Sequence, residues 1–210
     1  MKAKVLLLIG LVAGGSAMAQ VVSQNIVGYV NVTVAKGKFA LISNPLNAPS
    51  NKLQDVINLP GQDAVFYTVE GGQFKSAILS GGEFGTENPV IAPGGGFFVF
   101  APTADLKITF VGEVDIAGAV AGISVPHGLS LLSSKLPKAG TLLTGLEYPG
   151  GDEVVFQYKN GGYVSDAISG GESGANGGAG VNVAVAESFF VNNTAAAKSW
   201  KQPSASALLQ

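Results

Sequence analysis

Hydrophobic and polar residues alternate along much of the chain with the two-residue period of half-buried β-strands. Residues 26–34 show this over their whole length, with small or apolar side chains at every second position from Ile26 to Val34. Shorter apolar runs at residues 39–43 and 97–100 predict buried strands, and residues 106–111 predict another strand. Many short strands separated by glycine-rich turns indicate an all-β protein.

Two stretches have the pattern of a β-hairpin. Residues 154–168 are centred on an Asn-Gly pair, the strongest short hairpin signal, because both residues readily adopt positive φ. Residues 64–78 are centred on a Gly-Gly pair and have the same strand-turn-strand pattern. The only helix that the pattern suggests after the first residues is a short one over residues 50–58, with Ser50 as its N-cap.

The chain contains an internal repeat, with an offset of about ninety residues. The order of the matched segments is kept throughout, so a tandem duplication is the simplest explanation. We therefore expect two tandem homologous modules, each a β-sandwich or an open barrel. The matched segments are 32–37 with 123–128, 41–43 with 131–134, 59–63 with 148–152, 65–67 with 155–157, 76–83 with 166–172 and 97–99 with 189–191.

The first residues have the features of a secretory signal peptide. Lys2 and Lys4 precede an apolar run, and Ala17-Met18-Ala19 predicts cleavage after Ala19. No later segment is long and hydrophobic enough to cross a membrane. We expect a protein that is extracellular or on the cell surface, with the periplasm as an alternative, and without a membrane span once the signal is removed. The expected organisation is a signal peptide at 1–19, a β-prone segment at 20–31, the first module at 32–114, a joint at 115–122, the second module at 123–203 and a tail at 204–210.

The composition narrows the classes of partner. Charged residues make up 12% of the chain, every basic residue is a lysine, and no cysteine is present. Without Lys2 and Lys4, ten lysines face fourteen acids, a net charge near −4. A chain without arginine and with net negative charge is a poor match for nucleic acid or an anionic membrane surface. We expect neither partner.

Residues 28–46 contain the segments Gly-Tyr-Val-Asn-Val-Thr-Val and Leu-Ile-Ser-Asn-Pro-Leu, and residues 93–99 read Pro-Gly-Gly-Gly-Phe-Phe-Val. In these motifs the chain resembles a family of uncharacterised bacterial secreted proteins built from one or two glycine-rich β modules. The resemblance implies the fold over nearly the whole chain after the signal, and it implies no activity, cofactor or site residue. The second copy departs from the motif, because Ala186-Glu187-Ser188 replaces the glycine run.

Side chains suited to catalysis are few. His127 is the only histidine, and its counterpart in the first copy is Lys36, so we expect it to lie in a solvated turn. Two carboxylates of the first copy have a counterpart in the second copy. We expect these side chains to stabilise turns, rather than to lie on either side of a glycosidic bond as the catalytic pair of a glycosidase does. These pairs are Asp63 with Asp152 and Glu83 with Glu172.

We therefore predict no enzyme, no cofactor and no catalytic site. A Ca²⁺ site that includes Glu172 and Asn176, in the glycine-rich loop of residues 169–181, remains an open alternative.

Two hypotheses of function remain. In the first, a structural protein assembles into a homo-oligomer, a fibre or a surface layer, because the β-prone N-terminal segment pairs with a neighbour's sheet edge. The alternative for that segment is pairing within its own module. The residues expected to carry the assembly are Val22, Ile26, Val27, Tyr29, Val30 and Val32.

In the second hypothesis, the protein is a carbohydrate-binding or adhesive module, because aromatic side chains can line a sugar-binding face. Alternation along the strands favours core packing for most of these rings. The aromatic residues in question are Tyr67, Phe74, Tyr148, Phe156, Tyr158, Tyr163 and Trp200.

Overall fold

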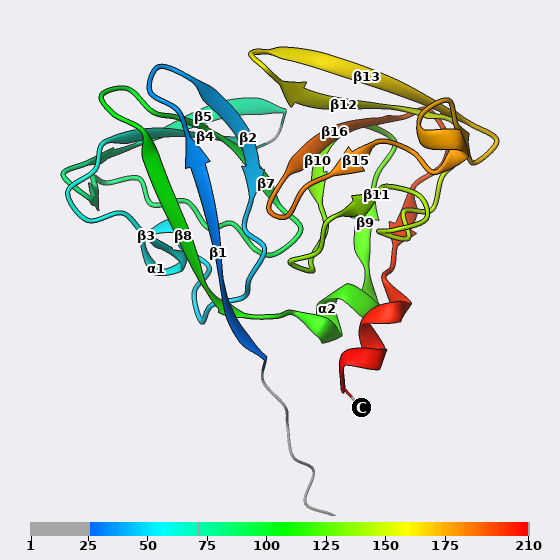
Figure 1. The fold of residues 1–210 in the computed structure, drawn as a ribbon, viewed down its shortest axis with the longest axis horizontal. Coiled ribbons are helices and arrows are strands. Elements are labelled where there is room, and N and C mark those ends of the chain that lie inside the picture. The colour runs from blue at the N-terminus through cyan, green and yellow to red at the C-terminus, as the bar shows by residue number, and fades with distance from the viewer. Residues whose placement is uncertain (1–25, 71, 210) are drawn as a thin grey trace, which may run out of the picture.

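The computed structural model describes residues 26–70 and 72–209, and strands dominate it, as the alternating pattern predicts. Its framework is a pair of five-stranded antiparallel sheets (Figure 1). The first sheet has the order β2-β7-β4-β5-β6, with β2 at Phe39–Ser43, β7 at Gly96–Phe100, β4 at Ala64–Glu70, β5 at Gln73–Ser80 and β6 at Glu83–Phe84. The second has the order β10-β16-β12-β13-β14, with β10 at Gly128–Ser133, β16 at Ser188–Asn193, β12 at Glu153–Lys159, β13 at Gly162–Ser169 and β14 at Glu172–Ser173.

Smaller sheets complete the two modules. In the first module, β1 (Val27–Val34), β8 (Leu106–Glu113) and β3 (Ile57–Asn58) form a sheet of order β1-β8-β3. Its inner residues, such as Phe110, pack with Phe66 and Phe97 of the large sheet in one buried cluster. In the second module, Trp200 packs with Phe189 and Val155 in the same manner. The strands involved there are β9 (Ile123–Val125) with β17 (Lys198–Trp200), and β11 (Gly140–Thr141) with β15 (Asn182–Val183).

Helices are short and lie between strands or at the chain end. They are α1 (Leu53–Val56), α2 (Ile116–Ala121) and two 3₁₀ turns, η1 (Asn176–Gly178) and η2 (Pro203–Leu209). The expected N-cap at Ser50 is wrong, because Lys52 precedes the first turn of α1 and makes no side-chain cap. A bridge from Lys52 to Val90 holds the chain extended up to that point. None of the helices within residues 26–70 and 72–209 has the length and apolar character needed to cross a membrane.

Strand β1 and helix α2 show where the two copies differ. β1 runs without a break across the expected boundary at residue 31, and α2 occupies most of the expected joint at 115–122. The repeat aligns β9 with the last three residues of β1. In the repeat, helix α2 therefore occupies the sequence positions that correspond to the first half of β1.

The strand registers correct the repeat by one residue in the hairpin. Phe66 of β4 and Val155 of β12 lie opposite equivalent valines of β7 and β16. The side chains of Phe66 and Val155 are both fully buried. Tyr67 therefore corresponds to Phe156, so the match of residues 65–67 with 155–157 was wrong. A one-residue shift moves every side chain of a strand to the other face of its sheet. The shared letters Val-Phe suggested an alignment that the pattern of burial excludes.

The two modules meet about an approximate two-fold axis. The backbone N–H of Ser43 donates to the carbonyl of Ala186 (2.9 Å), and the equivalent N–H of Ser133 donates to the carbonyl of Gly94 (3.0 Å). Each hydrogen bond joins the edge of one large sheet, β2 or β10, to the segment before β16 or β7 of the other. The contact is therefore reciprocal, as in a symmetric dimer, although it lies within one chain.

Gly96 and Ser188 are equivalent residues that face each other at this axis. A Cβ atom added to Gly96 would lie 2.6 Å from the Ser188 Cβ, closer than real side chains approach. The Ser188 hydroxyl donates to the carbonyl of Ile42 (2.9 Å), which lies in the other module. The space at the axis thus accommodates one side chain. The second copy supplies this side chain, because it has Ser188 where the first copy has a glycine.

Candidate functional site

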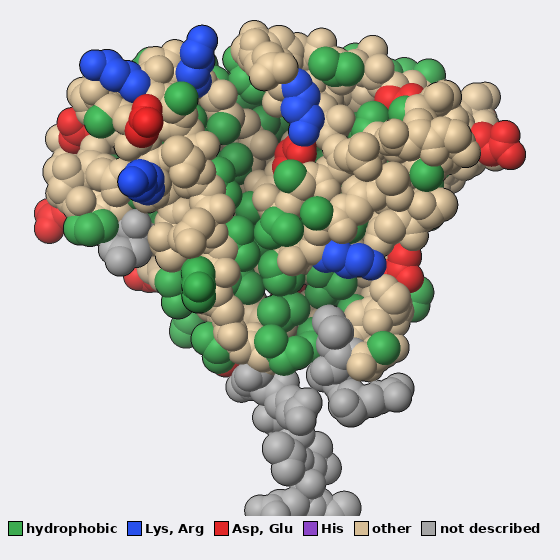
Figure 2. All heavy atoms as spheres, in the orientation of Figure 1, with side chains coloured by type: hydrophobic (Ala, Val, Ile, Leu, Met, Phe, Trp, Pro, Cys, Tyr) green, Lys and Arg blue, Asp and Glu red, His purple; other side chains and the backbone are tan. Residues whose placement is uncertain are grey.

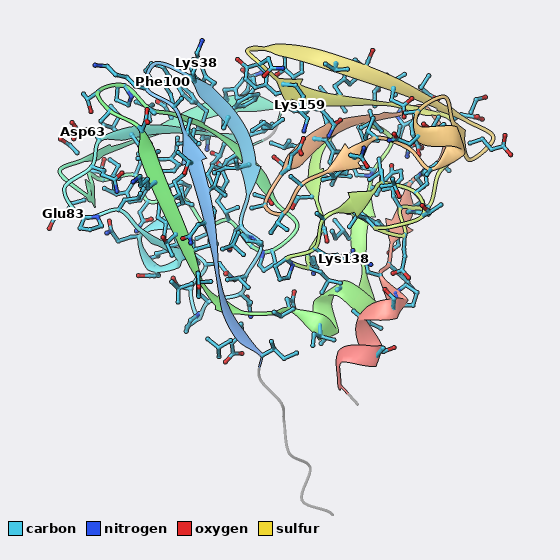
Figure 3. The ribbon with its side chains drawn as sticks, viewed as in Figure 1. Lys38, Asp63, Glu83, Phe100, Lys138 and Lys159 are labelled. Carbon is cyan, nitrogen blue, oxygen red and sulfur yellow. The ribbon has the colours of Figure 1, made fainter. Side chains whose placement is uncertain are left out.

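The residues considered for catalysis lie apart in the structure. His127 is exposed in the turn between β9 and β10. Glu83 and Glu172 are exposed at the starts of β6 and β14. Figure 3 shows Asp63 and Glu83 on the outer side of the first module, away from the second. The structure therefore does not bring the repeated carboxylates of the two copies together across one bond.

The two repeated aspartates make the same contact in both modules. Asp63 accepts a hydrogen bond from the N–H of Gly81 (2.9 Å), and Asp152 accepts one from the N–H of Gly170 (2.8 Å). Each carboxylate thus stabilises the Gly-Gly turn that leads to the last strand of its sheet. Both aspartates therefore stabilise turns, as expected, and each turn lies eighteen residues further along the chain.

We expect Asp63→Ala and Asp152→Ala each to lower the free energy of unfolding by about 1 kcal/mol, because each removes the acceptor of a turn N–H. The matched variants Asp63→Asn and Asp152→Asn keep an oxygen at that position and should lose less. Urea unfolding of the four variants checks this. Equal losses for alanine and asparagine would contradict the assigned contact.

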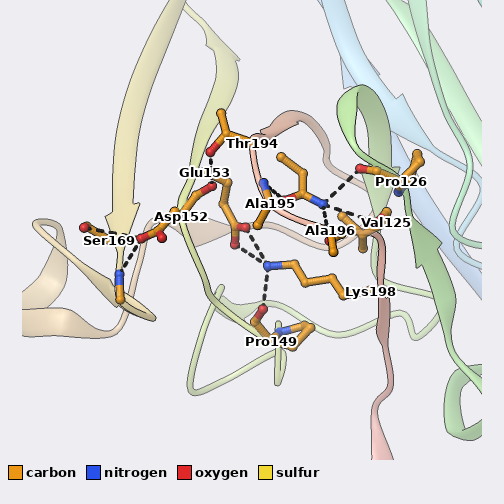
Figure 4. Close-up of polar contacts among 12 residues, drawn as sticks. Val125, Pro126, Pro149, Asp152, Glu153, Ser169, Thr194, Ala195, Ala196 and Lys198 are labelled. Atoms are coloured by element: carbon orange, nitrogen blue, oxygen red, sulfur yellow. Dashed lines mark hydrogen bonds and ion pairs between the residues drawn. The ribbon is translucent and has the colours of Figure 1, made fainter.

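Glu153, which is fully buried, and Lys198, which is half-buried, form an ion pair that the sequence pattern did not reveal (Figure 4). The ammonium group of Lys198 donates to both Glu153 carboxylate oxygens (2.8 and 2.5 Å) and to the carbonyl of Pro149 (2.7 Å). It also lies 4.9 Å from the centre of the Tyr148 ring. Burial and the Glu153 carboxylate raise the pKa of Tyr148. The ammonium and the carboxylate are therefore paired with protein groups and stabilise the second module, whereas the buried hydroxyl of Tyr148 has no hydrogen-bond partner among the described residues.

The other polar candidates do not assemble into a metal site. Among residues 26–70 and 72–209, no three His, Asp or Glu side chains lie close enough to hold a metal ion. The side-chain amide of Asn176, which was considered with Glu172 for a Ca²⁺ site, donates to the carbonyl of Gly180 within its own loop (2.7 Å). The loop also contains β14 and η1.

Aromatic side chains gather where the outer faces of the two large sheets meet. Phe98 and Phe190, which are equivalent, lie in contact across the axis with their ring centres 6.2 Å apart. Phe74 lies 6.1 Å from Phe98, and its equivalent Tyr163 lies 6.2 Å from Phe190. The two hairpins β4-β5 and β12-β13 thus contribute matching rings on the two sides of the axis.

Two cavities flank these rings, and each residue that lines the first has its two-fold equivalent in the larger lining of the second. Phe74 and Tyr163 belong to both linings, so the cavities adjoin. We call the pair the aromatic cleft. The first cavity, of about 390 Å³, is lined by Phe39, Tyr67, Phe74, Phe98, Tyr158 and Tyr163. The second, of about 670 Å³, is lined by Val69, Gly72, Phe74, Leu129, Ser130, Leu131, Phe156, Tyr163, Phe190 and Asn192.

The aromatic cleft has no charged lining residue. Figure 2 shows one face of the molecule, on which hydrophobic side chains gather between the modules. Burial against neighbouring groups, with a smaller contribution from Tyr158, raises the pKa of Tyr163, so its hydroxyl is a neutral donor at physiological pH. Phe74 and Tyr163 remain 59% and 55% exposed, so their rings are open to a ligand.

Five of the seven aromatic residues singled out from the sequence line this cleft. They are Tyr67, Phe74, Phe156, Tyr158 and Tyr163. The other two, Tyr148 and Trp200, are buried in the core of the second module. Phe98 and Phe190 were missed as cleft residues. The Phe-Phe pair that occurs in both copies could have revealed these cleft residues. Adjacent residues of a strand point to opposite faces of the sheet, so a Phe-Phe pair indicates that both faces are apolar.

The residues expected to carry assembly lie mostly in β1. This strand pairs with β8 over its whole length, from Val27 opposite Glu113 to Val34 opposite Leu106. Tyr29 and Val27 are exposed, whereas Val30 and Val32 are half-buried. Ile26 directly precedes the strand and accepts a hydrogen bond from Val114 (2.8 Å). Val22 and the signal peptide lie outside the described residues.

No protein-family model, curated protein or solved structure matches the chain.

Proposed function

We propose that this is a secreted, non-catalytic protein that binds a neutral glycan chain in the aromatic cleft. The observation that carries the proposal is the pair of adjoining cavities, lined by aromatic rings and by no charged residue. A sugar ring has an apolar face of C–H groups, which packs on an aromatic ring, and hydroxyls around its edge. The lining offers both kinds of contact.

The polar groups of the cleft suit such a ligand. Several lining residues carry neutral hydrogen-bond donors and acceptors. These are the hydroxyls of Tyr67, Tyr158 and Tyr163 and the side-chain amide of Asn192. The buried hydroxyl of Ser130 has no hydrogen-bond partner within the described residues. Binding sites commonly combine an apolar lining with a few polar groups that orient the ligand.

The arrangement favours a chain-like sugar over an extended peptide. A peptide recognised by strand addition needs a free strand edge. The β2 and β10 edges beside the cleft already form hydrogen bonds with the opposite module. Two adjoining cavities instead offer room for successive units of one polymer.

We expect the purified protein to bind neutral polysaccharides, such as unsubstituted β-glucan, xylan or mannan, in preference to polygalacturonate or alginate. Phe74→Ala and Tyr163→Ala should each weaken binding at least about tenfold, since exposed aromatic contacts often contribute more than 1 kcal/mol. Affinity electrophoresis and isothermal titration calorimetry measure the change.

The matched control is Ile78→Ala. Ile78 is 62% exposed on β5 and lines neither cavity, and its loss should leave glycan affinity unchanged. Tyr163→Phe separates the ring from its hydroxyl. Failure of every neutral polysaccharide to bind, or binding that survives both alanine variants in the cleft, would refute the proposal.

A further inference from the structure

The edges of the two large sheets are protected. Strands β6 and β14, at the outer edges of the large sheets, are two residues long and begin with Glu83 and Glu172. Short and charged edges resist pairing with other chains. The inner edges, β2 and β10, form hydrogen bonds with the opposite module. Strand β1 is also an edge strand, but it is eight residues long.

The composition of β1 suits it to pairing. Val27–Val34 contains no charged residue and no proline, the two features that commonly block an edge. Within the part of the chain that the structure describes, hydrogen bonds between β1 and another strand involve only β8. The β1 edge therefore carries backbone donors and acceptors and no blocking side chain.

The direction of the backbone identifies the groups at the open edge. Ile26 accepts a hydrogen bond from Val114 of the β8 side (2.8 Å), so its backbone faces β8. Backbone groups alternate in direction along an antiparallel strand. The N–H and C=O groups that face the open edge therefore belong to Val27, Tyr29, Asn31 and Thr33.

We propose that β1 pairs antiparallel with β1 of a second copy of this chain, with Val30 opposite Val30 on the two-fold axis. In this register Val27 lies opposite Thr33, and Tyr29 lies opposite Asn31. All four residues with open backbone groups then find partners in the second copy. A second copy is favoured because its strand is uncharged and has the same set of unpaired groups in the reverse order.

The pairing also keeps the two faces of the sheet distinct. Residues opposite each other in this register are both odd-numbered or both even-numbered, so half-buried Val30 and Val32 stay on the core side and Val27 and Tyr29 stay on the outer side. The product is one six-stranded sheet of order β3-β8-β1-β1-β8-β3. Because the contact uses the same edge of both copies, it closes on itself and gives a dimer rather than a fibre. It does not depend on glycan binding.

Cysteine crosslinking tests both the contact and its register, and the chain has no native cysteine to interfere. Cα atoms of a directly opposed pair without mutual hydrogen bonds lie about 4.5 Å apart, within the range that a disulfide spans. We expect Val30→Cys to give a disulfide-linked dimer in high yield under mild oxidation. Val32→Cys is the matched control, because in this register it lies opposite Gly28 and should crosslink at least tenfold less.

Sedimentation analysis supplies the second measurement. The unmodified protein should sediment as a dimer at micromolar concentration, and Tyr29→Lys should weaken dimerisation at least tenfold, because it places a charge beside the axis. Ile78→Lys adds the same charge on β5, at a residue 62% exposed, and should leave the dimer intact. A monomer at high concentration, a dimer that survives Tyr29→Lys, equal crosslinking of Val30→Cys and Val32→Cys, or filaments in electron micrographs would each overturn the proposal.

Discussion

Gly96→Ser is expected to lower the free energy of unfolding by about 2–3 kcal/mol, near the upper end of the cost of overpacking a core. The added Cβ would lie 2.6 Å from both the Cβ and the hydroxyl of Ser188, and 2.9 Å from the Leu131 side chain. The modules would have to separate at their axis to relieve this contact. Guanidinium unfolding measures the loss.

The two-fold relation predicts how this loss is repaired. In the exchanged double variant Gly96→Ser/Ser188→Gly, one serine again occupies the axis, and its hydroxyl is placed to donate to the carbonyl of Leu132, the equivalent of Ile42. We expect most of the lost stability to return. Gly85→Ser is the control, because a Cβ there meets no atom within 4 Å. A double variant no more stable than Gly96→Ser would contradict the symmetric packing at the axis.

Lys198→Met is expected to destabilise the protein by about 3–5 kcal/mol, the usual cost of leaving one member of a buried ion pair without its partner. The side chain of Glu153 is fully buried, and Lys198 is the only cation bonded to it in the described residues. Removal of the ammonium group also leaves the carbonyl of Pro149 without this donor. Thermal and chemical unfolding both report the effect.

The first module suggests that the charges themselves can be replaced. The strand registers place Ala64 where the second module has Glu153, and Leu106 where it has Lys198. An apolar pair therefore occupies this place in a closely related core. We expect Glu153→Met/Lys198→Met to lose less than half of the stability that Lys198→Met loses.

Lys201→Met provides the control for the ion-pair variants, because Lys201 is exposed next to the same strand and its change should stay within about 0.5 kcal/mol. If the double variant is less stable than Lys198→Met, the attraction between the two charges outweighs the free energy needed to remove them from water.

Joining two copies in one chain allows the two sides of the axis to differ. Phe39 in the first cavity corresponds to Leu129 in the second, and Tyr158 in the first corresponds to Val69 in the second. A symmetric dimer of identical chains would have to change both sides together. The single chain can therefore present one richly aromatic cavity and one larger, more aliphatic cavity to the same proposed ligand.

The local sequence determined the elements and the duplication. Alternating side chains predicted the strands, because the two-residue period of a half-buried strand is a local property. The Asn160-Gly161 pair predicted its hairpin, and both residues have positive φ in the turn. The repeated order of turns and strands predicted two similar modules, and the structure contains two five-stranded sheets of matching order.

Tertiary structure decided what depends on residues far apart in the chain. Phe66 and Phe156 share a motif, yet their registers place one in a core and the other in the cleft, because a one-residue shift reverses the face of a strand. Asp63 reaches the turn at Gly81, and Glu153 meets Lys198, only because strands distant in sequence become neighbours. The aromatic cleft arises in the same way: each module contributes rings that the sequence shows, and only the two-fold packing brings them together.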